Sequence, residues 1–179
     1  IICTGKATKR IEEFQYHTKE YIATLQLGAT TPSYDLEKEI DATYPTEHIT
    51  RLLVEDTLKN FVGTIEQIPP AFSACKVDGK RAYDLARKGD KVELKPKTLV
   101  IDEIELLECN LPEIKIRVVC SKGTYIRALA RDIGEALNSG AHLTGLIRTR
   151  VGDVRLEDCM QVDDFEAWLD QQDIEITND

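Results

Sequence analysis

IKIRVVCSKGTYIR, residues 114–127, is the stretch that decides the fold of this chain. Apolar residues alternate with charged or small ones in its first half, and this period of two predicts a half-buried strand. Lys122 and Gly123 supply a turn. The apolar positions that follow recur every three to four residues and predict a helix, capped by Thr124 and closed by Gly140 in a conformation of positive φ.

Tyr125 and Arg127 lie where this strand, turn and helix meet. The start of a helix favours anions because its first backbone N–H groups have no partner within the helix. Unstacked bases of RNA are commonly held by aromatic side chains and guanidinium groups. The corner therefore suits an unstacked nucleotide, although a turn tyrosine and a helix-surface arginine remain the simpler alternative.

Four stretches of the sequence, taken in order, carry a resemblance to a known family. Together they resemble the bacterial tRNA pseudouridine-55 synthases of the TruB type, and the resemblance covers roughly residues 3–152. Several co-linear blocks make this resemblance specific, whereas a lone Gly-Thr-Tyr-Ile-Arg would be weak. The four stretches are residues 19–28 (KEYIATLQLG), 68–87 (IPPAFSACKVDGKRAYDLAR), 120–127 (CSKGTYIR) and 139–150 (SGAHLTGLIRTR).

The resemblance implies a set of site residues. Tyr21 would stack on an extruded uracil and help to remove the proton from C5, although the pattern alone leaves a core tyrosine equally open. Arg127 would pair with the catalytic aspartate. Tyr125 and Leu146 would line the uridine pocket, and Lys19 would contact the substrate.

The nucleophilic aspartate of the family lies in a loop before the matched region, whereas this chain begins at Ile1. We therefore expect a fragment without the N-terminal part that carries this loop, in which Arg127 has no carboxylate partner. By motif, none of Asp35, Asp78 and Asp132 replaces the aspartate. We expect the chain alone to be inactive.

The activity that the resemblance implies is the isomerisation of uridine to pseudouridine in the T-loop of tRNA, at position 55. The expected partner is the T-arm of tRNA, and the full-length enzyme would be a cytoplasmic monomer without a cofactor. Two alternatives stay open: a non-catalytic tRNA-binding fragment, and a guide-RNA-dependent pseudouridine synthase.

The expected fold is α+β, because strands and helices interleave irregularly. It would contain a mixed, largely antiparallel sheet flanked by helices, as in the pseudouridine synthases, with their N-terminal strands missing. Residues 1–179 would form a single, N-terminally incomplete catalytic domain without a C-terminal RNA-binding β-domain. Shorter helices are expected at 81–88 and from about residue 163.

The net charge of −9 argues against RNA binding if it is spread evenly over the chain, so its distribution matters. Residues 153–179 hold ten acidic side chains and one basic one, so this tail alone carries −9. Residues 76–97 hold eight basic and four acidic side chains, and residues 110–151 hold seven and three, so each stretch carries +4. Because phosphate binding depends on local charge, the two basic stretches are compatible with an RNA partner.

The cysteines and histidines do not suggest a metal site. Five cysteines without a C-x-x-C pair, and three histidines away from them, fit no zinc-ligand spacing. Reduced and mostly buried thiols are expected instead. The chain has no apolar run long enough to cross a membrane, so no membrane partner is expected.

Overall fold

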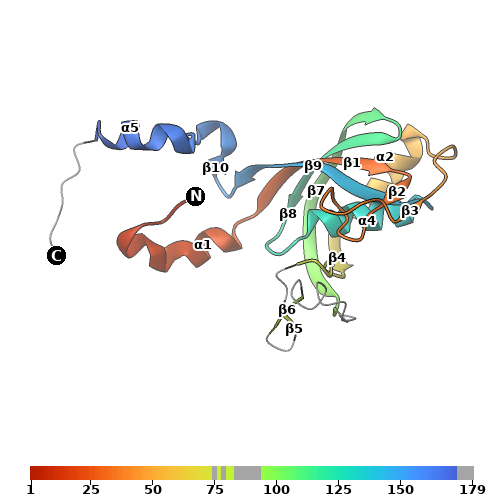
Figure 1. Cartoon of the computed structure of the whole chain (residues 1–179), viewed down its shortest axis with the longest axis horizontal. Helices are drawn as coiled ribbons and strands as arrows, with labels where there is room; N and C mark the ends of the chain where they lie inside the picture. Colours follow the sequence, from red (N-terminus) through yellow and green to blue (C-terminus); the bar gives the residue numbers. More distant parts are fainter. Residues whose placement is uncertain (74–75, 78–79, 83–93, 173–179) are drawn as a thin grey trace.

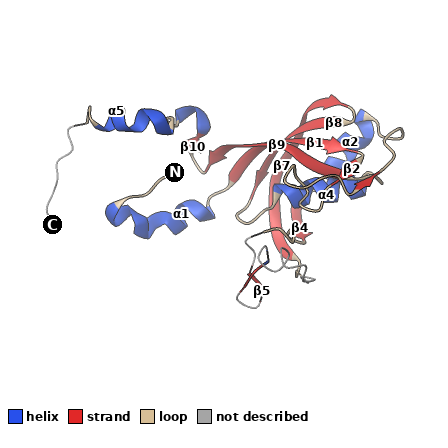
Figure 2. Ribbon diagram, viewed as in Figure 1, coloured by secondary structure: helices blue, strands red, loops and turns tan. Residues whose placement is uncertain are grey.

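A six-stranded sheet, in the order β10-β9-β1-β8-β7-β4, forms the centre of the computed structural model (Figure 1, Figure 2). The structure describes residues 1–73, 76–77, 80–82 and 94–172. Within them the elements are η1 (Gly5–Arg10), α1 (Ile11–Tyr16), β1 (Lys19–Leu27), β2 (Ala29–Thr30), β3 (Ala42–Thr43), α2 (Arg51–Lys59), β4 (Gly63–Gln67), β5 (Lys76–Val77), β6 (Lys80–Arg81), β7 (Lys97–Asn110), β8 (Glu113–Cys120), α4 (Ile126–Ala136), β9 (Ala141–Val151), β10 (Val154–Arg155), η2 (Leu156–Asp158), η3 (Val162–Asp164) and α5 (Phe165–Leu169).

The core lies between one face of this sheet and two helices. Strand β1 pairs antiparallel with β8 on one side and with β9 on the other, and its alternation buries Ala23, Leu25 and Leu27. Helix α4 packs on β9 and β1 through its apolar stripe, which includes the fully buried Leu129 and Ile133, while α2 packs on β7. The α+β class predicted from the sequence is confirmed, and the strand pairs of the central sheet are antiparallel.

The opposite face of the sheet carries a cluster of charged side chains. Arg117 of β8 forms ion pairs with Glu20 of β1 and with Glu103 and Glu105 of β7, at N–O distances of 3.0, 2.6 and 3.1 Å. Hydrogen bonds from Arg117 to these carboxylates raise its pKa. This alternation of buried and charged side chains fixes the register, because a shift by one residue would exchange the two faces.

The corner after β8 differs from the sequence prediction in two details. Gly123 has a φ of +88° and makes the expected turn, but Thr124 bonds back to the carbonyl of Ser121, so α4 starts at Ile126 without a side-chain cap. After α4, Asn138 takes the positive φ that was expected at Gly140. Gly140 is needed for space instead, since a Cβ there would lie 2.5 Å from the Tyr44 ring.

The terminal elements extend away from the sheet. Figure 1 shows α1 and the segment from η2 to α5 on the same side of the molecule, beyond the ends of β1 and β9. The predicted last helix is α5, but Phe165 and Trp168, which stack on each other, are more than two-fifths exposed. The helix predicted at 81–88 lies almost entirely outside the described residues.

The prediction of mostly buried thiols is wrong for the cysteines that the structure describes. All four of these, Cys3, Cys109, Cys120 and Cys159, are free, and among them only Cys120 is buried. Sequence periodicity placed Cys120 in the core of β8, whereas the other three lie at the ends of elements or in irregular segments.

Gly134 should be intolerant of alanine although it lies inside a helix. A Cβ there would lie 2.4 Å from the backbone nitrogen of Ala141, because α4 and β9 approach closely at this point. Glycine to alanine in a helix normally stabilises by about 1 kcal/mol, but Gly134→Ala is expected to destabilise by about 1–3 kcal/mol through overpacking. Urea denaturation measures this.

Glu135→Ala is the matched control, since Glu135 is exposed on the same helix. Its free energy of unfolding should stay within about 0.5 kcal/mol of the wild-type value. A stabilised Gly134→Ala variant would contradict the close approach of α4 and β9.

Candidate functional site

A pocket of about 480 Å³ opens at the amino end of α4. Four of the five residues predicted to form the site line it, although they come from three different elements: Tyr21 from β1, Tyr125 and Arg127 from the start of α4, and Leu146 from β9. The remaining lining residues are Asp35, Leu36, Thr124, Ile126, Leu143, Thr144 and Gly145.

Two irregularities in β9 present Leu146 to this pocket. The register between β1 and β9 shifts between Glu20 and Tyr21 and again between Thr24 and Leu25. Bulges of this kind redirect side chains and are frequent beside active sites. Leu146 lies between the two shifts, opposite Ala23, and is 45% exposed rather than buried. It therefore offers an apolar surface to whatever enters.

Tyr21 lines the pocket from the central strand β1. Its ring packs against the hydrophobic core, and the positive charge of Arg148 on β9 acts on its hydroxyl. Burial raises the pKa of Tyr21, Cys120 adds to this, and Arg148 opposes it only in part. Tyr21 is therefore a neutral phenol at physiological pH, and its side chain lines the pocket.

Arg127 is paired, which corrects the expectation that it lacks a carboxylate partner. Its Nη1 donates to Asp35 Oδ2 at 2.9 Å and to the carbonyl of Ser33 at 3.2 Å, while Nη2 donates to the carbonyl of Phe72 at 2.9 Å. The side chains of Arg127 and Asp35 are only 22% and 25% exposed. A partly desolvated guanidinium needs such partners, and the loop at 33–35 supplies them.

Asp35 is the site residue that the sequence prediction missed. Its Oδ1 accepts hydrogen bonds from Ser33 Oγ at 2.6 Å and from the backbone N–H of Glu37 at 2.9 Å. Burial raises the pKa of Asp35, but these two bonds and the Arg127 charge outweigh it, so its pKa lies below the usual value. No motif marks Asp35, and only the fold brings it across 92 residues to Arg127.

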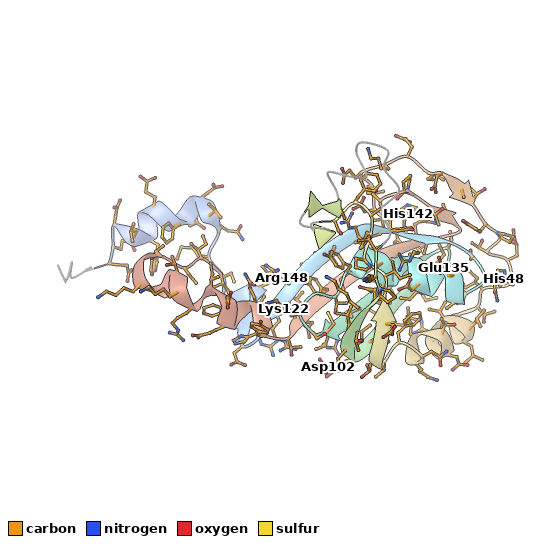
Figure 3. All side chains as sticks on the ribbon, turned by 90° about the horizontal axis from the view of Figure 1, so that it is seen from below. His48, Asp102, Lys122, Glu135, His142 and Arg148 are labelled. Atoms are coloured by element: carbon orange, nitrogen blue, oxygen red, sulfur yellow. The ribbon has the colours of Figure 1, made fainter. Side chains whose placement is uncertain are left out.

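Lys19, the fifth predicted site residue, lies outside this pocket. Its ammonium group donates to the carbonyls of Phe14, Gln15 and His17 at the end of α1. Burial lowers its pKa, as do the nearby charges of Arg148 and Lys122, which Figure 3 shows close to the junction of α1 and the sheet. In the structure Lys19 thus connects the end of α1 to β1. A contact between Lys19 and the substrate stays a prediction.

Among the described residues, no group of three or more His, Cys, Asp or Glu side chains could hold a metal ion. The buried His142 bonds to the carbonyl of Ala29, and His48 to that of Leu137. Within the same residues, no helix is long and apolar enough to cross a membrane.

The ion pair of Asp35 should stabilise the fold in a pH-dependent way. Asp35→Asn is expected to lower the free energy of unfolding at pH 7 by about 1.5–3 kcal/mol, as for a charge-assisted hydrogen bond. A depressed pKa means that the stabilisation is complete above the usual aspartate value near 4 and is lost as the pH falls through the lowered pKa. Denaturant titrations of both proteins at pH 7 and pH 3 measure the difference.

Asp56→Asn is the control for this experiment. Asp56 pairs with Lys59 on the exposed surface of α2, where a salt bridge contributes little. Equal effects of the two substitutions at pH 7 would argue against a structural role of the Asp35–Arg127 pair.

The chain is similar to known proteins along its whole length. The family model "TruB family pseudouridylate synthase (N terminal domain)" matches residues 1–126, and "tRNA pseudouridylate synthase B C-terminal domain" matches residues 127–177. The boundary between them falls inside α4, one residue after its start.

Two curated relatives are named tRNA pseudouridine synthase B. The protein of Phocaeicola vulgatus is 89% identical over 175 residues, which are 98% of this chain and 74% of the relative. That of Bacteroides fragilis is 85% identical over 178 residues, which are 99% of this chain and 76% of the relative. The chain thus spans about three quarters of their length.

Solved structures share the fold at lower identity. A chain in the structure titled "Crystal Structure of a Cbf5-Nop10-Gar1 Complex" is 26% identical with a TM-score of 0.66, and the match covers 95% of this chain and 42% of that one. A second, titled "Structure of H/ACA RNP bound to a substrate RNA containing 2'-deoxyuridine", is 24% identical with a TM-score of 0.63, over 96% of this chain and 41% of that one. These likenesses agree with the pseudouridine synthase fold expected from the sequence.

Proposed function

Because the chain belongs to the TruB family of pseudouridylate synthases, we propose that it serves the isomerisation of uridine to pseudouridine in the T-loop of tRNA, at position 55. The observation that carries this proposal is the pocket in which Tyr21 and Tyr125 lie beside the Arg127–Asp35 pair. Relatives of 85–89% identity with this name favour a stand-alone tRNA enzyme over a guide-RNA-dependent one.

The size and lining of the pocket fit one extruded nucleotide. Its volume of about 480 Å³ falls within the range of about 300–1,000 Å³ that is usual for small-ligand sites. Extruding a base costs a few kcal/mol, and stacking on one aromatic ring returns about 1–3 kcal/mol. Tyr21 below the base, with Leu146 and Tyr125 around it, could therefore offset most of the cost of removing uridine from its loop.

The proposed reaction rearranges one nucleotide without a change of oxidation state. The N1–C1′ bond breaks, the uracil turns, the C5–C1′ bond forms, and a proton leaves C5 while one is gained at N1. These steps exchange no electrons with a second molecule, so they require no redox cofactor. Because Tyr21 is a neutral phenol, we assign it first to stacking; any role in moving the C5 proton would use its hydroxyl, whose pKa the charge of Arg148 lowers in part.

Asp35 is poorly suited to act as the nucleophile. Both of its oxygens accept hydrogen bonds, and its lowered pKa reflects a stabilised, weakly basic carboxylate. Its geometry fits a different task, which is to hold Arg127. Three of the five N–H groups of this guanidinium have partners among the described residues, so the remaining two could orient a second carboxylate. We therefore propose that residues 1–179 bind the substrate without turning it over.

We further propose that the chain acts as a monomer in the cytoplasm. The described residues of a single copy line a pocket of nucleotide size, which supports this proposal. The cytoplasm follows from the proposed tRNA substrate. The single catalytic domain over residues 1–179 stays a prediction.

A turnover assay tests the proposal on activity. Purified residues 1–179 are expected to bind an unmodified tRNA and to form no pseudouridine at position 55, as measured by chemical labelling of pseudouridine and primer extension. A chimera that also carries the part of the 89% identical relative outside the matched region should form it. Pseudouridine formed by residues 1–179 alone would contradict the assignment of Asp35 to a supporting role.

Substitution of Tyr21 tests the stacking role. Tyr21→Ala is expected to weaken binding of a T-arm hairpin by about five- to 150-fold, since base stacking is worth about 1–3 kcal/mol. Tyr21→Phe keeps the ring and should bind within about twofold of the wild type. Fluorescence anisotropy of a labelled hairpin gives both affinities, and equal losses for the two variants would refute stacking.

A further inference from the structure

Gln67 makes a two-way hydrogen bond to the backbone at the edge of the pocket. It is the last residue of β4, and only 1% of its surface is exposed. Its Oε1 accepts from the N–H of Tyr125 at 2.9 Å, and its Nε2 donates to the carbonyl of Tyr125 at 3.2 Å. The carboxamide thus pairs with the backbone N–H and C=O of Tyr125 in the way that the backbone of a neighbouring strand would.

The backbone of Tyr125 needs such a partner. Tyr125 precedes the first helical residue, with φ −95° and ψ 107°, and no side chain caps the helix there. Its carbonyl already accepts from the N–H of Leu129, but its own N–H points away from the helix. A backbone N–H that is shielded from water without a partner is costly. Gln67 satisfies this donor and fixes the peptide in one orientation.

The segment after Gln67 is fastened to the same helix at two further points. The carbonyl of Ile68 accepts from Arg131 at 3.0 Å, and the carbonyl of Phe72 accepts from Arg127 at 2.9 Å. Residues 67–72 therefore run along the first turns of α4, with Gln67 attached at Tyr125. The prolines at 69 and 70 restrict the backbone between these points.

We propose that Gln67 is a positioning residue for the uridine pocket: its carboxamide holds the backbone of Tyr125 and so sets the place of the Tyr125 ring and of Arg127, two residues later. This inference rests on the proposed function, because it assumes that a uridine enters the pocket. To the proposed function, the inference adds a residue outside the pocket that determines the orientation of Tyr125 and Arg127. The alternative is that Gln67 stabilises the fold without affecting recognition.

Two RNA probes separate these possibilities. One is a T-arm hairpin with uridine at the target position, and the other is the same hairpin with an abasic site there. The ratio of the two affinities reports on the pocket alone, since contacts to the rest of the hairpin cancel. The wild-type chain should prefer the uridine hairpin by about tenfold, as expected from base stacking. Gln67→Leu, of similar volume, should reduce this ratio to about one.

Ile65→Val is the matched control on the same strand. Ile65 packs against the core, and the hydrogen bonds to the Tyr125 backbone described above come from Gln67 and not from Ile65. Its truncation should therefore lower Tm and leave the ratio of the two hairpin affinities unchanged. If Gln67→Leu lowers Tm but keeps the wild-type ratio, the positioning role is overturned and the proposed function stands. If the wild-type chain itself shows no preference for uridine, the pocket assignment and this inference both fail.

Gln67→Glu provides a test that does not depend on a changed shape. When protonated, the buried glutamic acid can donate to the Tyr125 carbonyl and accept from its N–H, as the amide does; when ionised, it can only accept. Burial raises the pKa of such a carboxyl. The ratio for Gln67→Glu should therefore approach the wild-type value at pH 5 and fall toward one at pH 8, while the wild-type ratio stays constant. A ratio without this pH dependence would overturn the proposal.

Discussion

The organisation of the pocket depends on the guanidinium of Arg127. This group lies at the start of α4 and is largely shielded from water, so its charge must be compensated by groups that the fold brings to it. Asp35 and Ser33 come from the loop after β2, and Phe72 from the segment after β4. Three distant parts of the sequence are thereby held in register around one cavity.

The sheet provides the rigid frame on which this junction is built. β1 is paired on both sides, and its buried alternation leaves no freedom to shift. α4 is held against β9 at Gly134, where the two backbones are in close approach. The pocket thus lies between a fixed strand and a fixed helix. On binding, the substrate would change its conformation rather than the pocket. A preorganised pocket of this kind spends little binding energy on its own ordering.

The sequence predicted this frame well because its signals are local. The alternation at 114–120 and the helical period from Ile126 correspond to β8 and α4, and four of the five predicted site residues line one pocket. The predicted cap fails because Thr124 makes a different local bond, to the carbonyl of Ser121 three residues earlier. A tertiary contact then takes its place, since the N–H of Tyr125 donates to the carboxamide of Gln67.

Asp35 and Gln67 show why the remainder of the site could not be read from sequence. Each acts on a residue far along the chain, 92 positions away for Asp35 and 58 for Gln67. Neither lies in a motif that indicates its chemistry, and an aspartate in a polar loop is usually solvated. Their roles appear only when the loop after β2 and the end of β4 converge on the start of α4.

A crystal structure of residues 1–179 bound to a T-arm hairpin with uridine at the target position would test the central claim most directly. The uracil is expected to leave the loop and lie on the ring of Tyr21, with Tyr125 and Leu146 at its edges and the Arg127–Asp35 pair intact. A uracil that remains stacked within the hairpin, or that binds elsewhere on the protein while the pocket stays open, would contradict it.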